Sequence, residues 1–239
     1  YIPMSLEELY VDYSVIGKNK GSVEILAVGA PKKIIDSHMD LLNVLGLEAV
    51  AFDTSTGAAG RLFDYQDLST DIPAVLIDFG SLSADITIHD KTVIVTSTAS
   101  CGGDIFTSLI AKKLGVTTGE GYVIKTKYGL GKSKKQKEIT EALSPELEKL
   151  IKEIRRMVRY YEDRSNKNKE IGQIVIMGGG AHMPGLSDYL TNSLRLPVRM
   201  SDPWQAFNLG RLKAPKGAEK SMYVTSSGLS LVNAKEIFK

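Results

Sequence analysis

The sequence predicts an α/β fold, because segments with the two-residue repeat of β-strands alternate with segments that have the apolar spacing of amphipathic helices. Apolar, β-branched runs occur near residues 11–30, 74–99 and 173–177, and helical spacing follows each of these regions. Glycine clusters stand where strands pass into helices. With 239 residues, 43% of them hydrophobic, the chain is long enough for a sizeable core.

The N-terminal part predicts a hairpin, a helix, a strand and a second helix. Two β-branched runs, Val11–Gly17 and Val23–Ala30, are separated by polar residues and glycine, which is typical of adjacent strands. A helix follows over 34–45, with Gly46 at its C-terminal end. Leu47–Phe52 predicts a further strand, and residues 54–63 predict a helix with a Thr or Ser cap.

The rest of the chain predicts a three-stranded meander followed by helices and one more pair of strands. The meander consists of PAVLIDFG, SADITIHD and KTVIVTSTA, and CGGDIFTSLIAKKLG predicts the helix after it. Residues 117–144 read as helix, polar loop and helix start. A long amphipathic helix is expected from Pro145, at its first position, to about Arg164. Then IVIMGGGAHMPG and its continuation read as strand, glycine turn, helix and strand, and YVTSSGLSLV as a short helix.

Composition excludes several classes of protein. Lys and Arg total 30 against 28 Asp and Glu, so no clustered excess indicates a dedicated nucleic-acid or membrane-surface protein; Lys132 to Lys137 is only a brief basic run. The single cysteine, Cys101, forms no internal disulfide, which favours a reducing compartment. No stretch reaches about 18 consecutive apolar residues, and the first residues lack signal-peptide features, so we expect a soluble protein. Because the chain begins with Tyr1 rather than Met, we also expect residues upstream of it.

The first candidate site is DFGSLSADITI. Asp78 ends an apolar strand and Gly80 begins a turn, so a carboxylate is fixed beside a loop, Ser81 to Ala84, whose amides would cradle phosphate oxygens. One carboxylate there suits hydrated Mg²⁺, which takes few protein ligands. The alternative is a bulged hairpin in which the aspartate only serves turn chemistry.

Two further glycine clusters are candidate sites. Gly102 and Gly103 open a helix, either to let the helix cross a ligand closely or simply as N-terminal punctuation, with Asp104 facing the helix dipole. Gly178, Gly179 and Gly180 follow an apolar strand and would let a flat ring or ribose lie against bare backbone. A tight structural turn is the alternative.

Several other chemistries are excluded by the motifs that the sequence lacks. There is no Walker run, no GxGxxG between a strand and a helix, and no G-x-S-x-G elbow. The three histidines are scattered without zinc-ligand spacing.

The order of these segments carries a resemblance. DFGSLSADITI, CGGDIFTSLIAKKLG, ELEKLIKEIRRMVRYYEDR and IVIMGGGAHMPGLSDYLTNSLRLPV together resemble the second half of the actin-like ATPases, most closely the PilM family of type IV pilus assembly proteins, with FtsA as a neighbour. The resemblance implies an actin-like (ribonuclease H-like) ATPase fold with an incomplete first lobe and a largely complete second lobe. VDYSVIG, VEILAVGAP and EAVAFDTSTGAAGRLF resemble the PilM inserted subdomain and the return into the first lobe.

The resemblance implies roles for the candidate residues. Asp78 would face magnesium and the attacking water, Gly80 and Ser81 the phosphates, and Gly178–Gly180 the adenine and ribose of ATP or ADP. Gly102 and Gly103 belong to the connecting helix. An acidic and a basic residue on a short helix near the ribose would be Glu120 and Lys125, for which two solvated surface charges are the alternative.

The resemblance also implies a division of the chain. We expect a small inserted subdomain over 1–52, a first-lobe helix and linker over 53–72, a second lobe over 73–203 with a helical subdomain at about 117–165, and a return helix of the first lobe over 204–239. Nothing before Val11 resembles the phosphate-1 hairpin of complete members. We therefore expect weak or absent ATP hydrolysis, and we expect the return helices near 58–63 and 223–232 to lack a sheet that would bury them.

The function implied is that of a nucleotide-responsive cytoplasmic scaffold of a type IV pilus-like machine. Its partner would be the cytoplasmic tail of a PilN-like membrane protein, with self-association as a further expectation, no nucleic acid, and contact with the inner face of the membrane only through that partner. The alternatives are an FtsA-like filament-forming division protein and an ATP-consuming enzyme of the sugar-kinase or chaperone branch. The ending LVNAKEIFK is too short for the membrane-targeting helix of FtsA relatives, which favours the pilus interpretation.

Overall fold

The structure is a computed structural model that describes residues 4–19, 21–66, 72–164 and 169–233. The chain forms two compact units. The first contains the residues up to Thr54 and the chain from Val232 onward, and the second is Ser55–Leu231. Each unit is described by itself.

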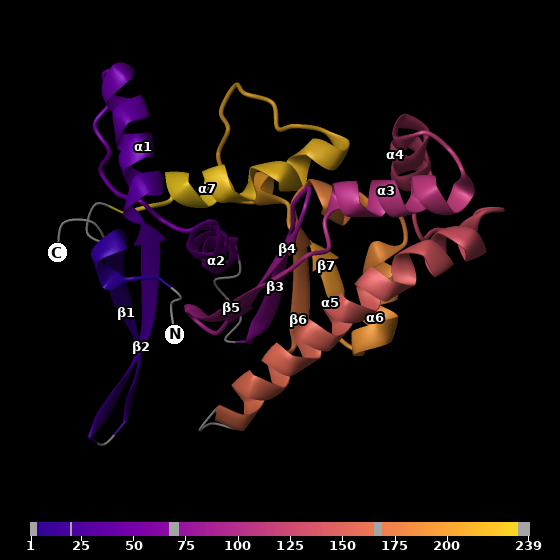
Figure 1. Ribbon diagram of the computed structural model, residues 1–239. Coiled ribbons are helices and arrows are strands. Elements are labelled where there is room, and N and C mark those ends of the chain that lie inside the picture. Colours follow the sequence, from indigo (N-terminus) through magenta and orange to yellow (C-terminus); the bar gives the residue numbers. More distant parts are fainter. Residues whose placement is uncertain (1–3, 20, 67–71, 165–168, 234–239) are drawn as a thin grey trace. The chain divides into compact units, whose positions relative to one another are not determined.

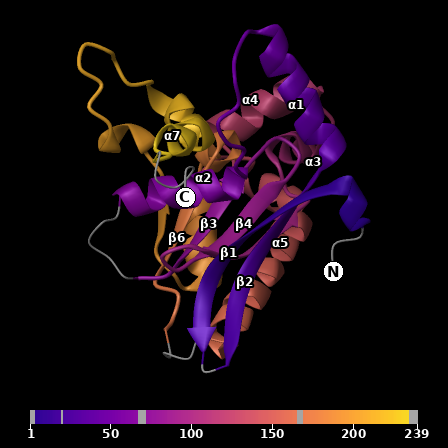
Figure 2. The same cartoon turned by 90° about the vertical axis from the view of Figure 1, so that its left-hand side faces the viewer.

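The first unit is a long hairpin followed by one helix (Figure 2). Strands β1 (Leu9–Asn19) and β2 (Ser22–Pro31) pair antiparallel, and α1 (Lys32–Val44) follows, after a short 3₁₀ turn, η1 (Leu6–Glu8), at the start. These elements confirm the expected hairpin and helix. Among the unit's described residues only Leu9 is fully buried, so most apolar side chains of the hairpin remain exposed.

The expected strand at Leu47–Phe52 is wrong, because this segment has no regular structure. Gly46, with φ of 67°, ends α1 in the left-handed conformation as expected of a helix-terminating glycine, and the chain then runs exposed to Thr54. An apolar run becomes a strand only where a neighbouring strand accepts its hydrogen bonds, and the hairpin pairs only with itself among the described residues.

The second unit is built on a five-stranded sheet in the order β5-β4-β3-β6-β7 (Figure 1). The strands are β3 (Ala74–Phe79), β4 (Ala84–His89), β5 (Val93–Ala99), β6 (Gln173–Met177) and β7 (Val198–Met200). The first three form the expected antiparallel meander, whereas β6 lies parallel to β3 and β7 parallel to β6. The sheet is therefore mixed, with its parallel pairs on one side.

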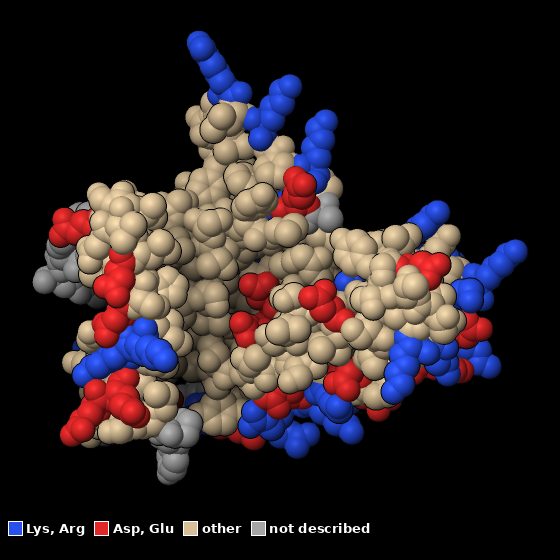
Figure 3. Space-filling view, turned by 45° about the horizontal axis from the view of Figure 1, so that its top comes forward, with Lys and Arg blue, Asp and Glu red and all other residues tan. Residues whose placement is uncertain are grey.

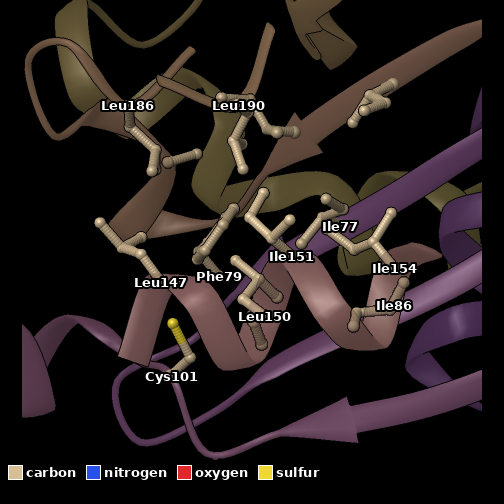
Figure 4. Close-up of a cluster of buried hydrophobic side chains, with 14 of the residues drawn as sticks. Ile77, Phe79, Ile86, Cys101, Leu147, Leu150, Ile151, Ile154, Leu186 and Leu190 are labelled. Atoms are coloured by element: carbon tan, nitrogen blue, oxygen red, sulfur yellow. The ribbon is translucent and has the colours of Figure 1, made fainter. Parts of the chain in front are cut away.

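Alternate residues of β3 face opposite sides of this sheet, and each side has its own core. Val75, Ile77 and Phe79 belong to the larger core, which three helices cover: α3 (Gly103–Leu114), α5 (Gln136–Arg164) and α6 (Leu186–Leu194). Near the centre of Figure 4, Leu147, Leu150, Ile151 and Ile154 of α5 lie against Ile77, Phe79 and Ile86 of the sheet.

The opposite face is covered by α2 (Ser55–Gln66) and α7 (Val224–Ser230). Leu62 and Phe63 of α2 and Val224 of α7 pack with Leu76 of β3 and with the alternate residues of β6. The expectation that these helices would lack a sheet is therefore wrong. Helix α7 approaches α2 closely because Gly228 has no side chain: a Cβ there would overlap the carbonyl of Ala58.

Helix α5 begins nine residues earlier than expected, at Gln136, so Pro145 lies inside it rather than at its first position. The apolar spacing continues through this extra length, and Ile139 and Leu143 are fully buried in the larger core. A proline inside a helix costs about 3 kcal/mol. Burying two large aliphatic side chains gains about 3–6 kcal/mol, which offsets it.

The remaining elements surround the end of the sheet at which β3 and β6 finish. They are α4 (Thr118–Lys127) and the 3₁₀ turns η2 (Gly179–His182), η3 (Pro203–Ala206) and η4 (Gly217–Tyr223). In the part of the chain that the structure describes, no helix has the length and apolar character needed to cross a lipid bilayer.

Candidate functional site

A cavity of about 530 Å³ opens in the second unit where β3 and β6 end. Because these two strands are parallel and Asp78 is in register with Met177, the residues that follow each strand meet at one edge of the sheet. The cavity is lined by Asp78, Phe79, Gly80, Ser81, Gly103, Asp104, Tyr122, Lys125, Thr126, Gly178, Gly179, Gly180, His182, Met183 and Met222. Eight of the ten candidate residues thus line one space, and Gly102 and Glu120 do not.

The 80–83 loop is tied to the start of α3 by backbone hydrogen bonds. The Gly103 N–H donates to the Gly80 carbonyl at 2.9 Å, and the Asp104 N–H donates to the Ser81 carbonyl at 2.7 Å. Gly102 is buried behind the loop, and a Cβ on it would overlap the Ser81 carbonyl. The glycine pair therefore permits a close crossing between helix and loop. The N–H groups of Gly103 and Asp104 are not available to an anion, because carbonyl groups of the 80–83 loop already accept their hydrogen bonds.

Lys125 reaches into the cavity from α4 and is buried. Its Nζ donates to the Gly103 carbonyl at 2.7 Å and lies 5.1 Å from the centre of the Tyr122 ring. Burial lowers the pKa of Lys125, and the nearby Asp104 carboxylate opposes part of that effect. The interpretation of Lys125 as a solvated surface charge is wrong: it is a buried cation beside the 80–83 loop.

Glu120 lies elsewhere, at the first turn of α4. Its carboxylate accepts hydrogen bonds from the Thr117 N–H at 2.9 Å and the Thr117 hydroxyl at 2.8 Å. In return the Thr117 hydroxyl accepts from the Glu120 N–H, which completes a capping box. These bonds lower the pKa of Glu120. The sequence T-T-G-E already contains this pattern, which is a helix-start signal.

The three glycines, Gly178–Gly180, approach the end of β3 so closely that two of them have no room for a side chain. Gly178 has φ of 82°, and a Cβ on it would overlap the Asp78 carboxylate and lie 2.6 Å from the Phe79 carbonyl oxygen. A Cβ on Gly180 would lie 2.9 Å from that of Phe79. Gly179 differs, because its nearest neighbour would be Met222 at an ordinary 3.7 Å. Of the three glycines, only Gly179 therefore has room for a side chain.

The sequence did not reveal that η4 holds the glycine loop, Gly178–Gly180, through Ser221. The Gly178 N–H donates to the Ser221 carbonyl at 3.0 Å, and the buried Ser221 hydroxyl donates to the Gly178 carbonyl at 3.0 Å. His182 Nε2 lies 2.9 Å from the same hydroxyl. Because the hydroxyl's one proton is already used, Nε2 carries the donating hydrogen. Burial lowers the pKa of His182, which favours the neutral ring. No local motif around Ser221 would have revealed this role.

Asp78 stands beside Asp85, its cross-strand partner on β4. Burial, and then the charge of Asp85, raise the pKa of Asp78. Both carboxylates also border a small second cavity of about 10 Å³, next to the start of α2. Among the described residues no group of three or more His, Cys, Asp and Glu side chains would hold a metal ion. Asp78 and Asp104 are the two carboxylates that line the large cavity. Asp78 alone nonetheless fits Mg²⁺, which keeps most of its waters and needs only one or two protein carboxylates beside phosphate oxygens.

The sheet order and the cavity between the 80–83 loop and Gly178–Gly180 are those of an actin-like ATPase fold. Solved structures with this fold are similar to the chain. The chain matches EutJ, an ethanolamine utilization protein from Carboxydothermus hydrogenoformans, with a TM-score of 0.58, 17% identity, and 84% of this chain and 62% of that one covered. It matches MreB5 of Spiroplasma citri, bound to AMPPNP, with a TM-score of 0.59, 15% identity, and coverage of 84% and 64%.

Within this class, the model of the type IV pilus assembly protein PilM matches residues 1–234, and the chain belongs to that family. The chain is similar to a solved PilM-PilN type IV pilus biogenesis complex, with a TM-score of 0.75 and 20% identity. The match covers 97% of this chain and 68% of that one. The chain thus spans roughly two thirds of the length of these neighbours. No curated protein sequence matches it.

Proposed function

We propose that this chain is a nucleotide-responsive scaffold of a type IV pilus-like assembly machine and that its large cavity binds ATP or ADP. The observation that carries this proposal is the convergence of the 80–83 loop, Lys125 and the glycine loop on one cavity of about 530 Å³. That volume lies within the range of about 300–1,000 Å³ usual for small-molecule sites. The AMPPNP-bound MreB5 neighbour shares the fold.

The lining supplies both polar groups and apolar surface. Ser81, Lys125 and Asp78 supply a hydroxyl, a cation and a carboxylate, which suit phosphate oxygens and an accompanying cation. Gly179 and Met222 supply bare backbone and a thioether for a flat base. When bound beside Asp78, Mg²⁺ would neutralise phosphate charge and favour the ionised form of that carboxylate.

We expect nucleotide binding with weak or absent hydrolysis by these 239 residues. Hydrolysis requires groups that orient water and others that stabilise charge on the transferring phosphoryl group. Lys125 is the only Lys or Arg among the described residues that line the cavity, and its Nζ is already bonded to the Gly103 carbonyl. A steady-state phosphate-release assay tests this expectation, and turnover at ordinary enzymatic rates of about 1–1,000 per second would contradict it.

Binding is tested by titrating the chain with fluorescent ATP in the presence and absence of Mg²⁺. The Gly179→Val variant places methyl groups in the cavity while its Cβ makes only an ordinary contact with Met222, so we expect affinity to fall at least tenfold. Gly119→Val is the matched control, because no atom lies within 4 Å of a Cβ built on Gly119. Absence of saturable binding by the unaltered chain, or equal binding by the two variants, contradicts the proposal.

The partner that we propose is the cytoplasmic tail of a PilN-like membrane protein, which would place the chain at the cytoplasmic face of the membrane. Family membership supports this, as does the similarity to a PilM-PilN complex. Strand β1 has one edge without a pairing strand among the described residues, with Tyr13 and Val15 exposed, and an extended tail adds to such an edge. Titration with the tail peptide tests the proposal, and a Val15→Pro chain that binds the peptide as tightly as the unaltered chain excludes β1.

A further inference from the structure

A local excess of positive charge lies between α4 and α5, although the chain as a whole is nearly neutral. Residues 127–137, KYGLGKSKKQK, contain five lysines and no acidic residue. All five lysine side chains are exposed. Lys and Arg side chains gather at the end of the second unit where α3, α4 and the start of α5 meet (Figure 3). Nothing in the proposed nucleotide site uses this cluster, here called the lysine turn.

Hydrogen bonds of its backbone and of Gln136 hold the lysine turn in place, and Lys135 is its one lysine with an ion pair among the described residues. The Leu130 N–H donates to the Pro184 carbonyl at 2.7 Å, and the Gln136 side chain donates to the Leu130 carbonyl at 2.9 Å. Among the described residues, Lys132 and Lys134 form no ion pair, and Lys135 lies 3.7 Å from an exposed Glu138. The charges are therefore available to a partner and are presented on an ordered turn.

The surroundings of the lysine turn favour a flat anionic surface over a grooved partner. Neither cavity described above includes any of these lysines in its lining. All five cations are lysines, and a lysine ammonium acts as a hydrated point charge. None is arginine, whose planar guanidinium group binds individual phosphates and bases through paired hydrogen bonds. Val123 and Tyr128 are exposed beside Lys127, whose Nζ lies 5.4 Å from the Tyr128 ring centre. Apolar and tyrosine side chains next to lysines are typical of the lipid headgroup region.

We propose that the lysine turn binds an anionic lipid membrane directly. This adds a second contact to the expectation that the chain reaches the membrane only through a partner, and it does not depend on nucleotide binding. Each lysine near an anionic bilayer strengthens binding by about fivefold. The binding falls with ionic strength, because salt screens exposed charges.

The test is co-sedimentation of the purified 239-residue chain with phosphatidylcholine vesicles that contain or lack phosphatidylglycerol, at low and high salt. We expect binding only to the anionic vesicles. The variant K132Q/K134Q/K137Q should bind about a hundredfold more weakly. The matched control K33Q/K152Q/K216Q removes the same charge from three other exposed lysines and should retain binding. Equal melting temperatures establish that both variants are folded.

Three results overturn the proposal. The first is equal binding of the unaltered chain to anionic and neutral vesicles. The second is equal loss in the two triple variants, which assigns the effect to net charge alone. The third is tighter retention on a DNA duplex than on anionic vesicles at the same salt concentration, which assigns the lysine turn to nucleic acid.

Discussion

Gly178 is the residue at which the structure predicts the largest cost for adding a single methyl group. Its φ of 82° and ψ of 170° lie in a region that is essentially restricted to glycine, so Gly178→Ala costs about 1–3 kcal/mol in backbone strain. The new Cβ would also overlap the Asp78 carboxylate and crowd the Phe79 carbonyl, and such overpacking adds about 1–3 kcal/mol. We therefore expect the free energy of unfolding to fall by about 4 kcal/mol, out of the roughly 5–15 kcal/mol usual for folded domains.

Urea denaturation followed by tryptophan emission measures this loss. Trp204 is the only tryptophan, and its indole N–H donates to the Lys220 carbonyl, next to the serine that holds the glycine loop. Gly179→Ala is the control: it adds the same methyl group one residue later, 3.7 Å from Met222 and without the positive φ. We expect its stability to change by less than about 1 kcal/mol. Equal stability of the two variants would refute the account of the glycine loop given above.

Three other predictions concern charges and caps. Because the folded pKa of Asp78 is raised above its usual 3.8, stability falls as the pH rises from 3.8 through the folded pKa, and Asp78→Asn should raise the melting temperature at pH 7. The gain in melting temperature should vanish well below pH 3.8, where Asp78 is protonated and is as neutral as the asparagine that replaces it. A difference in melting temperature that does not change with pH would contradict this reasoning. Thr117→Ala should cost about 1 kcal/mol in urea denaturation by breaking the capping box, while ATP affinity, measured by titration, stays unchanged; a loss of affinity would return Glu120 to the ribose site. Lys125→Met should weaken ATP binding about tenfold to a hundredfold, since a hydrogen bond to a charged group contributes about 1.5–3 kcal/mol; unaltered affinity would remove Lys125 from the site.

The parts of the fold that the sequence predicts well are those set by local pattern. The β3–β5 meander follows from alternation and turn residues, and the glycine clusters mark where strands end. β6 lies parallel to β3 with Met177 opposite Asp78, and this register puts Gly178 next to Asp78. β3 and β6 are far apart in the sequence, and the periodicity of each strand does not specify that they pair.

The errors arise where a partner distant in sequence decides the outcome. Leu47–Phe52 has strand composition but finds no strand to pair with among the described residues. Pro145 carries a helix-start signal, yet buried Ile139 and Leu143 upstream extend the helix through it. Glu120 is charged and near the site in sequence, but its nearest hydrogen-bonding group is the cap of its own helix. Local signals state what a residue favours, and tertiary contacts decide which preference prevails.

The burial of α2 and α7 alters how the second unit is understood as a binding module. A sheet with one bare apolar face would depend on other chain segments for its stability, but here α2 and α7 cover that face. Helix α7 directly continues η4, whose Ser221 is bonded to Gly178, and the Arg61 side chain of α2 donates to the Gly228 carbonyl of α7. The glycine loop is therefore supported by the same helices that close the core. The glycine loop is bonded to Ser221 of η4, and α7 follows η4 directly and packs closely on α2 at Gly228. We therefore expect a ligand that moves the glycine loop to shift α7 as a whole helix against α2.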